Sequence, residues 1–240
     1  MADLLTVLWK EWRDMPALRG RSGVITLLSL LLFGGIILPL QMGAGFVSSP
    51  VALFGPLWMP FVLVLAVSAD MVAGERERHT LESLLATRLP DRALLVGKLL
   101  AMVSVGWLVS LGTMLSGLVV ANVGYGHGRL LLYPAYISVG IPVLSLLLLA
   151  LLAGLGAVCS AYAPTVRQAG QNLALFSLAP ALVLPAFFLL PRHWIAGAVH
   201  WLAGVGGGGV VAALALLLLV GDAIVLSVAC SRFQRIKLIR

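Results

Sequence analysis

The sequence predicts an all-α polytopic membrane protein, with six transmembrane helices. Two observations predict this class. Of the 240 residues, 61% are hydrophobic and 10% are charged, and the mean hydropathy is +1.08, which is too apolar for a soluble domain. Apolar segments also recur at close to the ~20 residues that a helix needs to cross a bilayer. Helices are expected because every backbone polar group must be paired inside lipid.

Six apolar segments are candidate spans. The third and fourth exceed the length that a bilayer requires, so we expect them to tilt or to project beyond it. Both contain small residues at i+4 spacing, a pattern suited to close helix packing: Gly112 and Ser116 in the third, and Ala153, Ala157 and Ala161 in the fourth. The six segments are Val24–Leu40, Phe54–Val72, Ala93–Val120, Pro134–Tyr162, Leu173–Leu190 and Val210–Ala229.

The distribution of Lys and Arg predicts the orientation. With the N-terminus inside, 14 of the 16 basic residues fall on the cytoplasmic side, and only Arg129 and Arg192 fall outside. Cytoplasmic loops retain Lys and Arg, so we expect both termini to be cytoplasmic. The same rule explains the net charge of +7 without a nucleic-acid partner. The cytoplasmic set is Lys10, Arg13, Arg19, Arg21, Arg76, Arg78, Arg88, Arg92, Lys98, Arg167, Arg232, Arg235, Lys237 and Arg240.

The N-terminal segment, Met1–Met15, has an amphipathic pattern. Tryptophan on an apolar face opposite charged residues is typical of a helix that lies in the membrane interface, and Pro16 is expected to end it. A simple anchor and a role in coupling both remain open for this helix. The charges also argue against a cleavable signal peptide. The apolar face is Leu5, Leu8, Trp9, Trp12 and Met15, and the polar face is Asp3, Lys10, Arg13 and Asp14.

A charged stretch, Gly74–Asp91, separates the second and third segments. Read as a helix, it places Leu81, Leu84 and Leu85 on one face, while the i,i+4 pairs Glu75–His79 and Arg78–Glu82 support the polar face. Pro90 ends it and Asp91 is a natural N-cap for the next helix. Such a helix suits docking into a groove of a soluble partner. A solvated loop that contacts nothing is the alternative.

The sequence of Gly74–Lys98, GERERHTLESLLATRLPDRALLVGK, resembles the loop between spans two and three of ABC-2 type transporter permeases. The family pattern reads roughly GE(R/K)E-x-(G/N)-T-L-E-x-L-L-x-x-P. His79 stands where the family more often has a small residue, and Arg88-Leu89 shifts the proline by one position. The resemblance implies that this loop is the coupling element that contacts the ATPase. Its candidate docking residues are Glu75, Arg76, Glu77, Arg78, Thr80, Leu81, Glu82, Leu84 and Leu85.

The resemblance also implies an architecture and partners. We expect one ABC-2 type transmembrane domain over 1–240, with a cytoplasmic interfacial helix at 1–22, a coupling loop at 73–92 and an extracellular loop at 191–209. The implied assembly pairs this permease with a second, identical or paralogous, and with two separately encoded ABC ATPase subunits. It would act as an exporter in the plasma (inner) membrane of a prokaryote. The apolar interior favours a lipidic, amphipathic or drug-like cargo.

The outer loop, Pro191–Gly209, has its own pattern. His193 and His200 repeat at seven residues, as do Trp194 and Trp201, which predicts a short interfacial or re-entrant helix followed by a glycine hinge. ABC-2 exporters have similar short extracellular helices. An ordinary helical metal pair uses i,i+4 spacing, so we expect no metal here.

No enzyme motif is present in the sequence. Only Lys98 of the three lysines follows a glycine, and no Walker A pattern surrounds it. We therefore expect no enzyme activity and no cofactor in this chain, with ATP and Mg²⁺ bound by the partner. A haem-export-type permease, or a membrane enzyme or assembly factor, are the alternatives. An acidic residue deep in a span marks a pathway or a buried contact. The candidate pathway residues are Asp222, Gln171, Asn172 and Asn122, with Gln168 as a further candidate.

Overall fold

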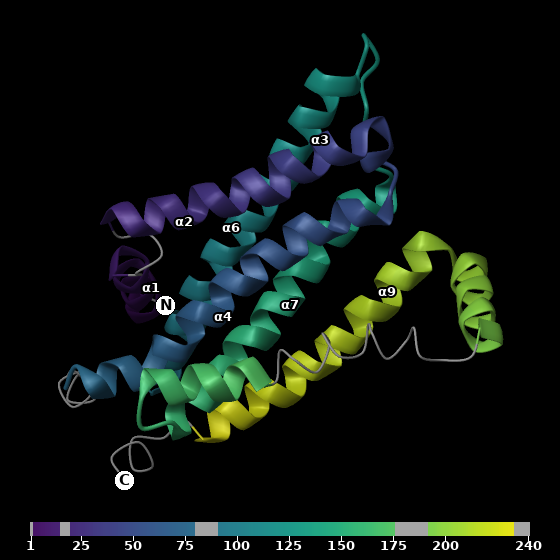
Figure 1. The fold of residues 1–240 in the computed structure, drawn as a ribbon. Helices are drawn as coiled ribbons and strands as arrows, with labels where there is room; N and C mark the ends of the chain where they lie inside the picture. The colour runs from purple at the N-terminus through teal and green to yellow at the C-terminus, as the bar shows by residue number, and fades with distance from the viewer. Residues whose placement is uncertain (1, 15–19, 80–90, 176–191, 233–240) are drawn as a thin grey trace.

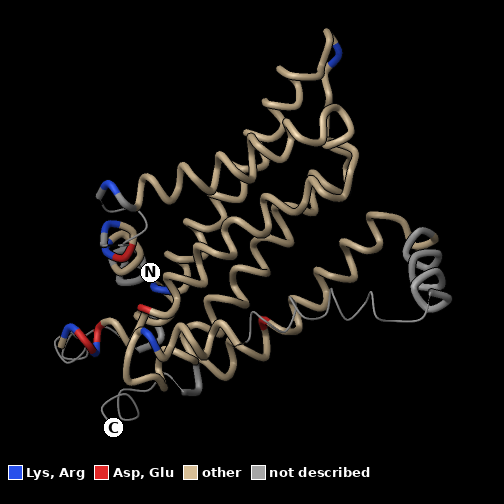
Figure 2. Tube along the Cα trace, in the orientation of Figure 1, with Lys and Arg blue, Asp and Glu red and all other residues tan. Residues whose placement is uncertain are grey.

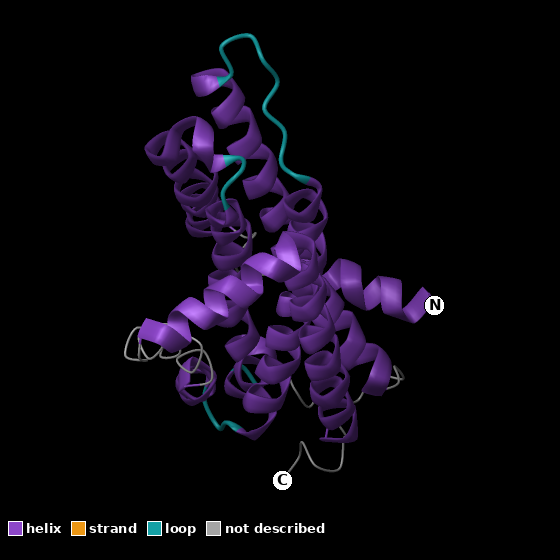
Figure 3. Cartoon of the chain, turned by 90° about the vertical axis from the view of Figure 1, so that its right-hand side faces the viewer, coloured by secondary structure: helices purple, strands orange, loops and turns teal. Residues whose placement is uncertain are grey.

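The computed structural model describes residues 2–14, 20–79, 91–175 and 192–232. These residues form helices joined by short loops and contain no strand (Figures 1 and 3). In chain order the helices are α1 Ala2–Asp14, α2 Gly20–Leu32, α3 Leu38–Met42, α4 Phe54–Glu77, α6 Asp91–Tyr125, α7 Ala135–Tyr162 and α9 Arg192–Arg232. A π-helical turn, Phe33–Ile37, joins α2 to α3, and 3₁₀ turns span Gly43–Phe46 and Pro50–Leu53. Residues 166–175 are also helical.

Five stretches of the described chain are long and apolar enough to cross a membrane. They are Gly23–Phe46, Pro50–Glu77, Leu94–Tyr125, Ala135–Tyr162 and Gly204–Ala229. Each overlaps one of the six predicted segments. The remaining one, Leu173–Leu190, lies outside the described residues except for its first three, which belong to the helical stretch 166–175. The all-α polytopic class is therefore observed, and the sixth span stays a prediction.

Helix α4 extends further than the sequence predicts. The apolar segment was expected to end at Val72 and the coupling loop to begin at 73, yet α4 continues to Glu77. Residues 73–77 are mostly good helix formers, and nothing in them breaks the hydrogen-bond ladder. The Arg78 N–H that follows still donates to the Gly74 carbonyl, and His79, with φ of 55°, leaves the helical conformation. The first charged residues of the coupling loop are thus the last turn of a membrane helix.

The centre of the bundle is formed by α4, α6 and α7, which pack closely through small residues. A β-carbon at Gly156 of α7 would collide with Ser68 of α4. One turn later, the Ser160 hydroxyl accepts from the Val72 and Ala73 amides and donates to the Ala69 carbonyl. Lipid tails are as apolar as leucine, so helices in a membrane associate through such packing and hydrogen bonds rather than through the hydrophobic effect.

The small-residue patterns predicted from the sequence lie at these contacts. Ala153 and Ala157 are buried in the same core as Val64 and Leu149. A β-carbon added at Gly35 of the π-helical turn would collide with Ser116 of α6. Ser116, Ala153 and Ala157 therefore lie at close helix contacts, as the small-residue pattern predicts.

Helices α2 and α9 lie at the periphery (Figure 1). Most large apolar side chains of α9 that the structure describes are exposed, and the helix packs against α7 through Gly154 and Gly221. Gly206, with φ of 71° and ψ of 162°, interrupts α9 between a first helical part, 192–205, and the membrane-crossing part. A helical segment and a glycine break therefore occur within the predicted outer loop. Its depth in the membrane stays a prediction.

Candidate functional site

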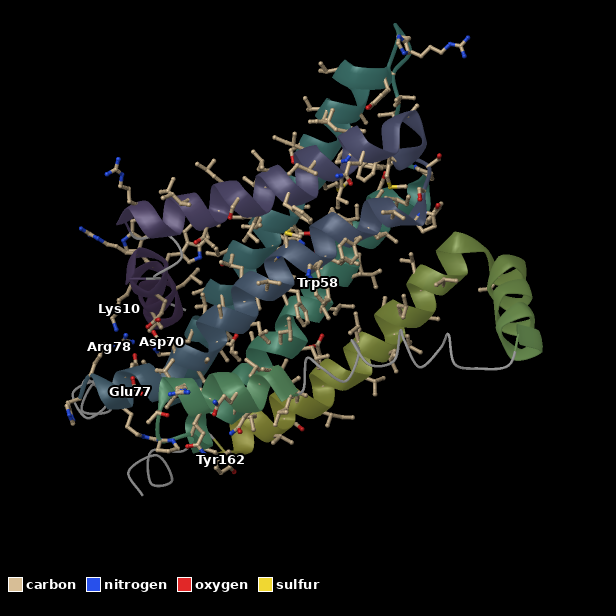
Figure 4. All side chains as sticks on the ribbon, viewed as in Figure 1. Lys10, Trp58, Asp70, Glu77, Arg78 and Tyr162 are labelled. Carbon is tan, nitrogen blue, oxygen red and sulfur yellow. The ribbon has the colours of Figure 1, made fainter. Side chains whose placement is uncertain are left out.

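Charged residues of the described chain gather at the end of the bundle where α4 ends and α6 begins (Figure 2). Figure 4 shows Lys10, Asp70, Glu77 and Arg78 at this end. The loop 126–134 between α6 and α7, which carries Arg129, lies at the opposite end (Figure 1). We call the first region the charged end, and define it by Glu11, Asp70, Glu75, Arg76, Glu77, Arg78 and Lys98.

A buried lysine connects three helices at the charged end. Lys98 of α6 has only 5% of its side chain exposed, and its Nζ lies 2.6 Å from Glu75 Oε1 of α4 and 3.2 Å from Glu11 Oε1 of α1. Lys10 adds a second cation 3.8 Å from Glu11. A buried ammonium requires paired, hydrogen-bonded partners. Lys98 therefore holds α1 and the end of α4 against α6.

Helix α1 is fastened to α6 by a second polar contact. The Trp12 indole N–H donates to Ser104 Oγ at 2.8 Å. Val7 is 4% exposed, and Leu8 packs against the same core. Trp9, which the sequence pattern places on the face toward the membrane, is 71% exposed and does not pack against the protein. The face of α1 that packs against the protein is centred on Val7, Leu8 and Trp12, and it lies on α6.

Two adjacent residues of α4 hold the corner where α7 ends. The Arg76 guanidinium donates to the Ala163 carbonyl at 2.7 Å and to the Ala161 carbonyl at 3.2 Å. These oxygens lie at the C-terminus of α7, where carbonyls lack helical partners and the dipole favours a cation. Glu77 Oε1 accepts from the Val166 amide at 2.8 Å. That amide begins the helical stretch 166–175, where the dipole favours an anion.

The helical stretch 166–175 is further fixed by its own cap and by small residues. Thr165 Oγ1 accepts from the Gln168 amide at 3.2 Å, as an N-cap hydroxyl does. Ala163 and Ala169 pack with Ala69 and Ala73 of α4 in a small buried cluster. We call Arg76, Glu77 and the backbone groups that they bind the corner clamp.

Arg78 and His79 end α4 on its exposed side. Arg78 Nη2 donates to Asp70 Oδ2 at 2.9 Å, and this hydrogen bond raises the pKa of Arg78. His79 has a left-handed backbone with φ of 55°, which glycine or asparagine adopts more readily. The position at which the ABC-2 pattern favours a small residue is thus the one with this strained backbone.

A family model described as ABC-2 family transporter protein matches residues 19–238. The match includes the end of α4, the start of α6 and all five described spans. The chain belongs to the ABC-2 transporter family. It is therefore a multi-pass membrane protein and a permease of an ABC transporter, and the family implies association with an ABC ATPase. No curated protein matches the chain.

The predicted docking residues of this ABC-2 permease fall into two groups. Glu75, Arg76, Glu77 and Arg78 are described, and each has a partner within the chain. Sequence reasoning placed them at an ATPase contact and did not anticipate these internal bonds. The others, Thr80, Leu81, Glu82, Leu84 and Leu85, lie outside the described residues. Docking to the ATPase stays a prediction for both groups.

Asp222 is the one predicted pathway residue that is buried. It is 6% exposed on α9, and neither carboxylate oxygen has a hydrogen-bond partner in the described part of the permease. Its neighbour Gly221 approaches Leu151 of α7, and Val225 approaches Gly154. A buried carboxyl without a partner costs free energy. Within the described residues this carboxyl is unsatisfied, the situation expected of a pathway residue or of a contact with a second subunit.

The other predicted pathway residues have different surroundings. Asn122 at the end of α6 donates to the Leu118 and Leu131 carbonyls at 2.9 Å and accepts from the Leu131 amide at 2.8 Å. These three bonds fold the loop after α6, so the structure favours a structural role. Gln168 and Gln171 are exposed on the helical stretch 166–175, and Asn172 is half-buried.

No group of three or more His, Cys, Asp or Glu residues that could hold a metal occurs within residues 2–14, 20–79, 91–175 and 192–232. The side chains of His193 and His200 lie outside the described ones. Cys159 is a free thiol on α7. The absence of a metal or a cofactor in this chain stays a prediction.

Proposed function

We propose that this ABC-2 permease is the transmembrane subunit of an ATP-driven exporter, with both termini in the cytoplasm of a prokaryotic cell. Two permeases, identical or paralogous, would form the pathway. Two separately encoded ATPase subunits would bind and hydrolyse ATP, because the sequence contains no Walker A pattern. The family match over residues 19–238 is the observation that carries this proposal.

The charged end supports a role in receiving the ATPase movement. The end of α4 leads directly into residues 80–90, the rest of the predicted coupling element. At the same place α4 is bonded to α1 and α6 through Lys98 and to the corner after α7 through Arg76 and Glu77. A force applied to residues 80–90 would therefore reach several helices at once.

The cargo is proposed to be lipidic, amphipathic or drug-like. Nearly all charges of the described spans lie near the charged end, and Asp222 is an isolated acid within apolar surroundings. A path with so few polar groups suits a molecule that is itself largely apolar. The alternatives, a haem-export-type permease or a membrane enzyme or assembly factor, gain no support from the described residues.

The test is reconstitution with the ATPase that co-purifies with the chain. The complex in liposomes should move a fluorescent amphipathic dye or a labelled lipid in an ATP-dependent manner. Glu82→Lys and Leu84→Asp should each uncouple dye movement from ATP hydrolysis while the permease stays folded. Arg129→Ala, at the far end of the bundle, serves as the control. Unchanged ATPase assembly and unchanged transport in both coupling variants would exclude the docking role.

A further inference from the structure

We propose that Arg76 and Glu77 are positioning residues that transmit movement of residues 80–90 to the helical stretch 166–175. The corner clamp, rather than direct contact with the ATPase, is then the function of these two side chains. The inference rests on the proposed function, since it names the route by which ATPase movement reaches the second half of the bundle.

The geometry of the clamp carries the proposal. Neighbouring residues of opposite charge bind the two opposite helix ends that meet at one corner. Arg76 makes two bonds to α7 carbonyls at 2.7 and 3.2 Å, and Glu77 makes one bond to the Val166 amide at 2.8 Å. Each charge has the sign that the helix dipole favours. This complementarity fixes the corner relative to the last turn of α4.

The apolar contact at this corner is too small to replace the clamp. It consists of Ala69 and Ala73 of α4 against Ala163 and Ala169, with Val166 packed beside them. Alanine side chains bury little apolar surface, so this contact contributes little stabilisation of its own. The Ser160 bonds hold α7 to α4 before the corner, whereas the bond from the Val166 amide to Glu77 holds the helical stretch 166–175 itself.

The clamp lies next to the end of α4 that receives the force. Glu77 is the last residue of α4, three positions before residue 80. Arg78 pairs with Asp70 of the same helix and makes no described bond to the corner. The helical stretch 166–175 carries Gln168, Gln171 and Asn172 and leads into the predicted fifth span. Movement through Arg76 and Glu77 would thus reach candidate pathway residues directly.

Two spin-label distances separate transmission from a purely structural role. Both use Leu108 of α6 as the reference, which is 51% exposed and lies two residues from the close crossing at Gly106. It is paired either with Thr87 in the coupling loop or with exposed Gln168. Labelled protomers lacking Cys159 and Cys230 are diluted into unlabelled protein and bound to the co-purifying ATPase. Distances are compared without nucleotide and with ATP plus vanadate. In the otherwise unchanged chain, we expect both distances to shift.

The variant Arg76→Ala/Glu77→Ala should keep the Thr87 shift and lose the Gln168 shift. Tyr125→Phe is the matched control, because it removes an exposed hydrogen bond of 2.8 Å, from Tyr125 to the Leu40 carbonyl, at the other end of α6. It should retain both shifts. If the double variant does not fold, the two distances are measured in the single variants Arg76→Ala and Glu77→Ala. Each of these leaves one half of the clamp in place.

The two proposals fail in different ways. A Gln168 shift that persists at full size in the clamp variants would overturn the inference and leave the proposed function intact. The inference would also be overturned if, in the chain with native Arg76 and Glu77, the Thr87 distance shifts and the Gln168 distance does not. Absence of ATPase binding, or of any Thr87 shift in that chain, would instead overturn the proposed function.

Discussion

Replacing Lys98 by methionine is the sharpest test of the charged end. The change keeps the length of the side chain and removes the ammonium that lies 2.6 Å from Glu75 Oε1 and 3.2 Å from Glu11 Oε1. The Lys98 and Glu75 side chains are 5% and 13% exposed, so the change removes a close ammonium from a buried carboxylate. Breaking a buried pair from one side costs about 3–5 kcal/mol. For a chain of this size that corresponds to a drop in unfolding temperature of roughly 6–20 °C.

Thermal unfolding in detergent, followed by tryptophan fluorescence, measures this drop. Lys98→Met/Glu75→Gln should be more stable than Lys98→Met alone, because it removes both charges and leaves Glu11 with Lys10 at 3.8 Å. Glu75→Gln alone should cost less, since Lys98 keeps Glu11 at 3.2 Å. A loss below about 1 kcal/mol for Lys98→Met, the range of exposed pairs, would refute the reasoning. So would a double variant no more stable than Lys98→Met.

Three further changes test other parts of the structure. Asp222→Leu should raise the unfolding temperature of the isolated permease, because it removes two buried oxygens that have no partner among the described residues. It should also lower transport or assembly, whereas Asp222→Asn should preserve expression. A destabilised Leu variant with full transport would contradict this. His79→Gly should stabilise the chain by up to about 1 kcal/mol by relieving the left-handed backbone, and an unchanged or lower unfolding temperature would argue against it. Cysteines at Ser48, Gly126 and Gly204 should be labelled from outside and one at Thr87 from inside, since the basic residues predict that orientation; outside labelling at Thr87 would reverse the topology.

Local patterns in the sequence predicted where the five described apolar stretches lie. The limits of α7 follow from Pro134 at its start and Ala163-Pro164 at its end, and the structure places the helix at Ala135–Tyr162. The amphipathic N-terminal segment is a helix over Ala2–Asp14. In both cases the signal lies within the segment itself, as apolar period or as a proline.

Contacts between distant segments were not predictable in this way. Lys98 and Glu11 are far apart in the chain, and Glu77 binds an amide 89 positions away. A charged residue at the end of a span reads equally well as a solvated side chain, a partner contact or an internal bond. The family resemblance favoured a contact between the ATPase and Arg76 and Glu77. In the structure, both side chains instead bind two helix ends of the same chain, an arrangement that only the three-dimensional fold reveals.

The residue type at position 79 also did not predict the left-handed backbone found there. His79 differs from the small residue typical of the family at this position, and composition gave no reason to expect φ of 55° there. The family pattern carried that information, because a preference for glycine or asparagine marks such a backbone.

Helix α6 has the proportions of a lever. It contains 35 residues without a proline, about 52 Å at 1.5 Å per residue. At Gly106 it passes so close to Val64 and Leu149 that a β-carbon would lie 2.8 and 3.0 Å from them, which makes this crossing a natural fulcrum. The arm from Gly106 to Lys98 is about 12 Å long, and the arm to Tyr125 is about 28 Å. A tilt imposed at the charged end would therefore appear at the far face of the membrane in the opposite direction and more than doubled.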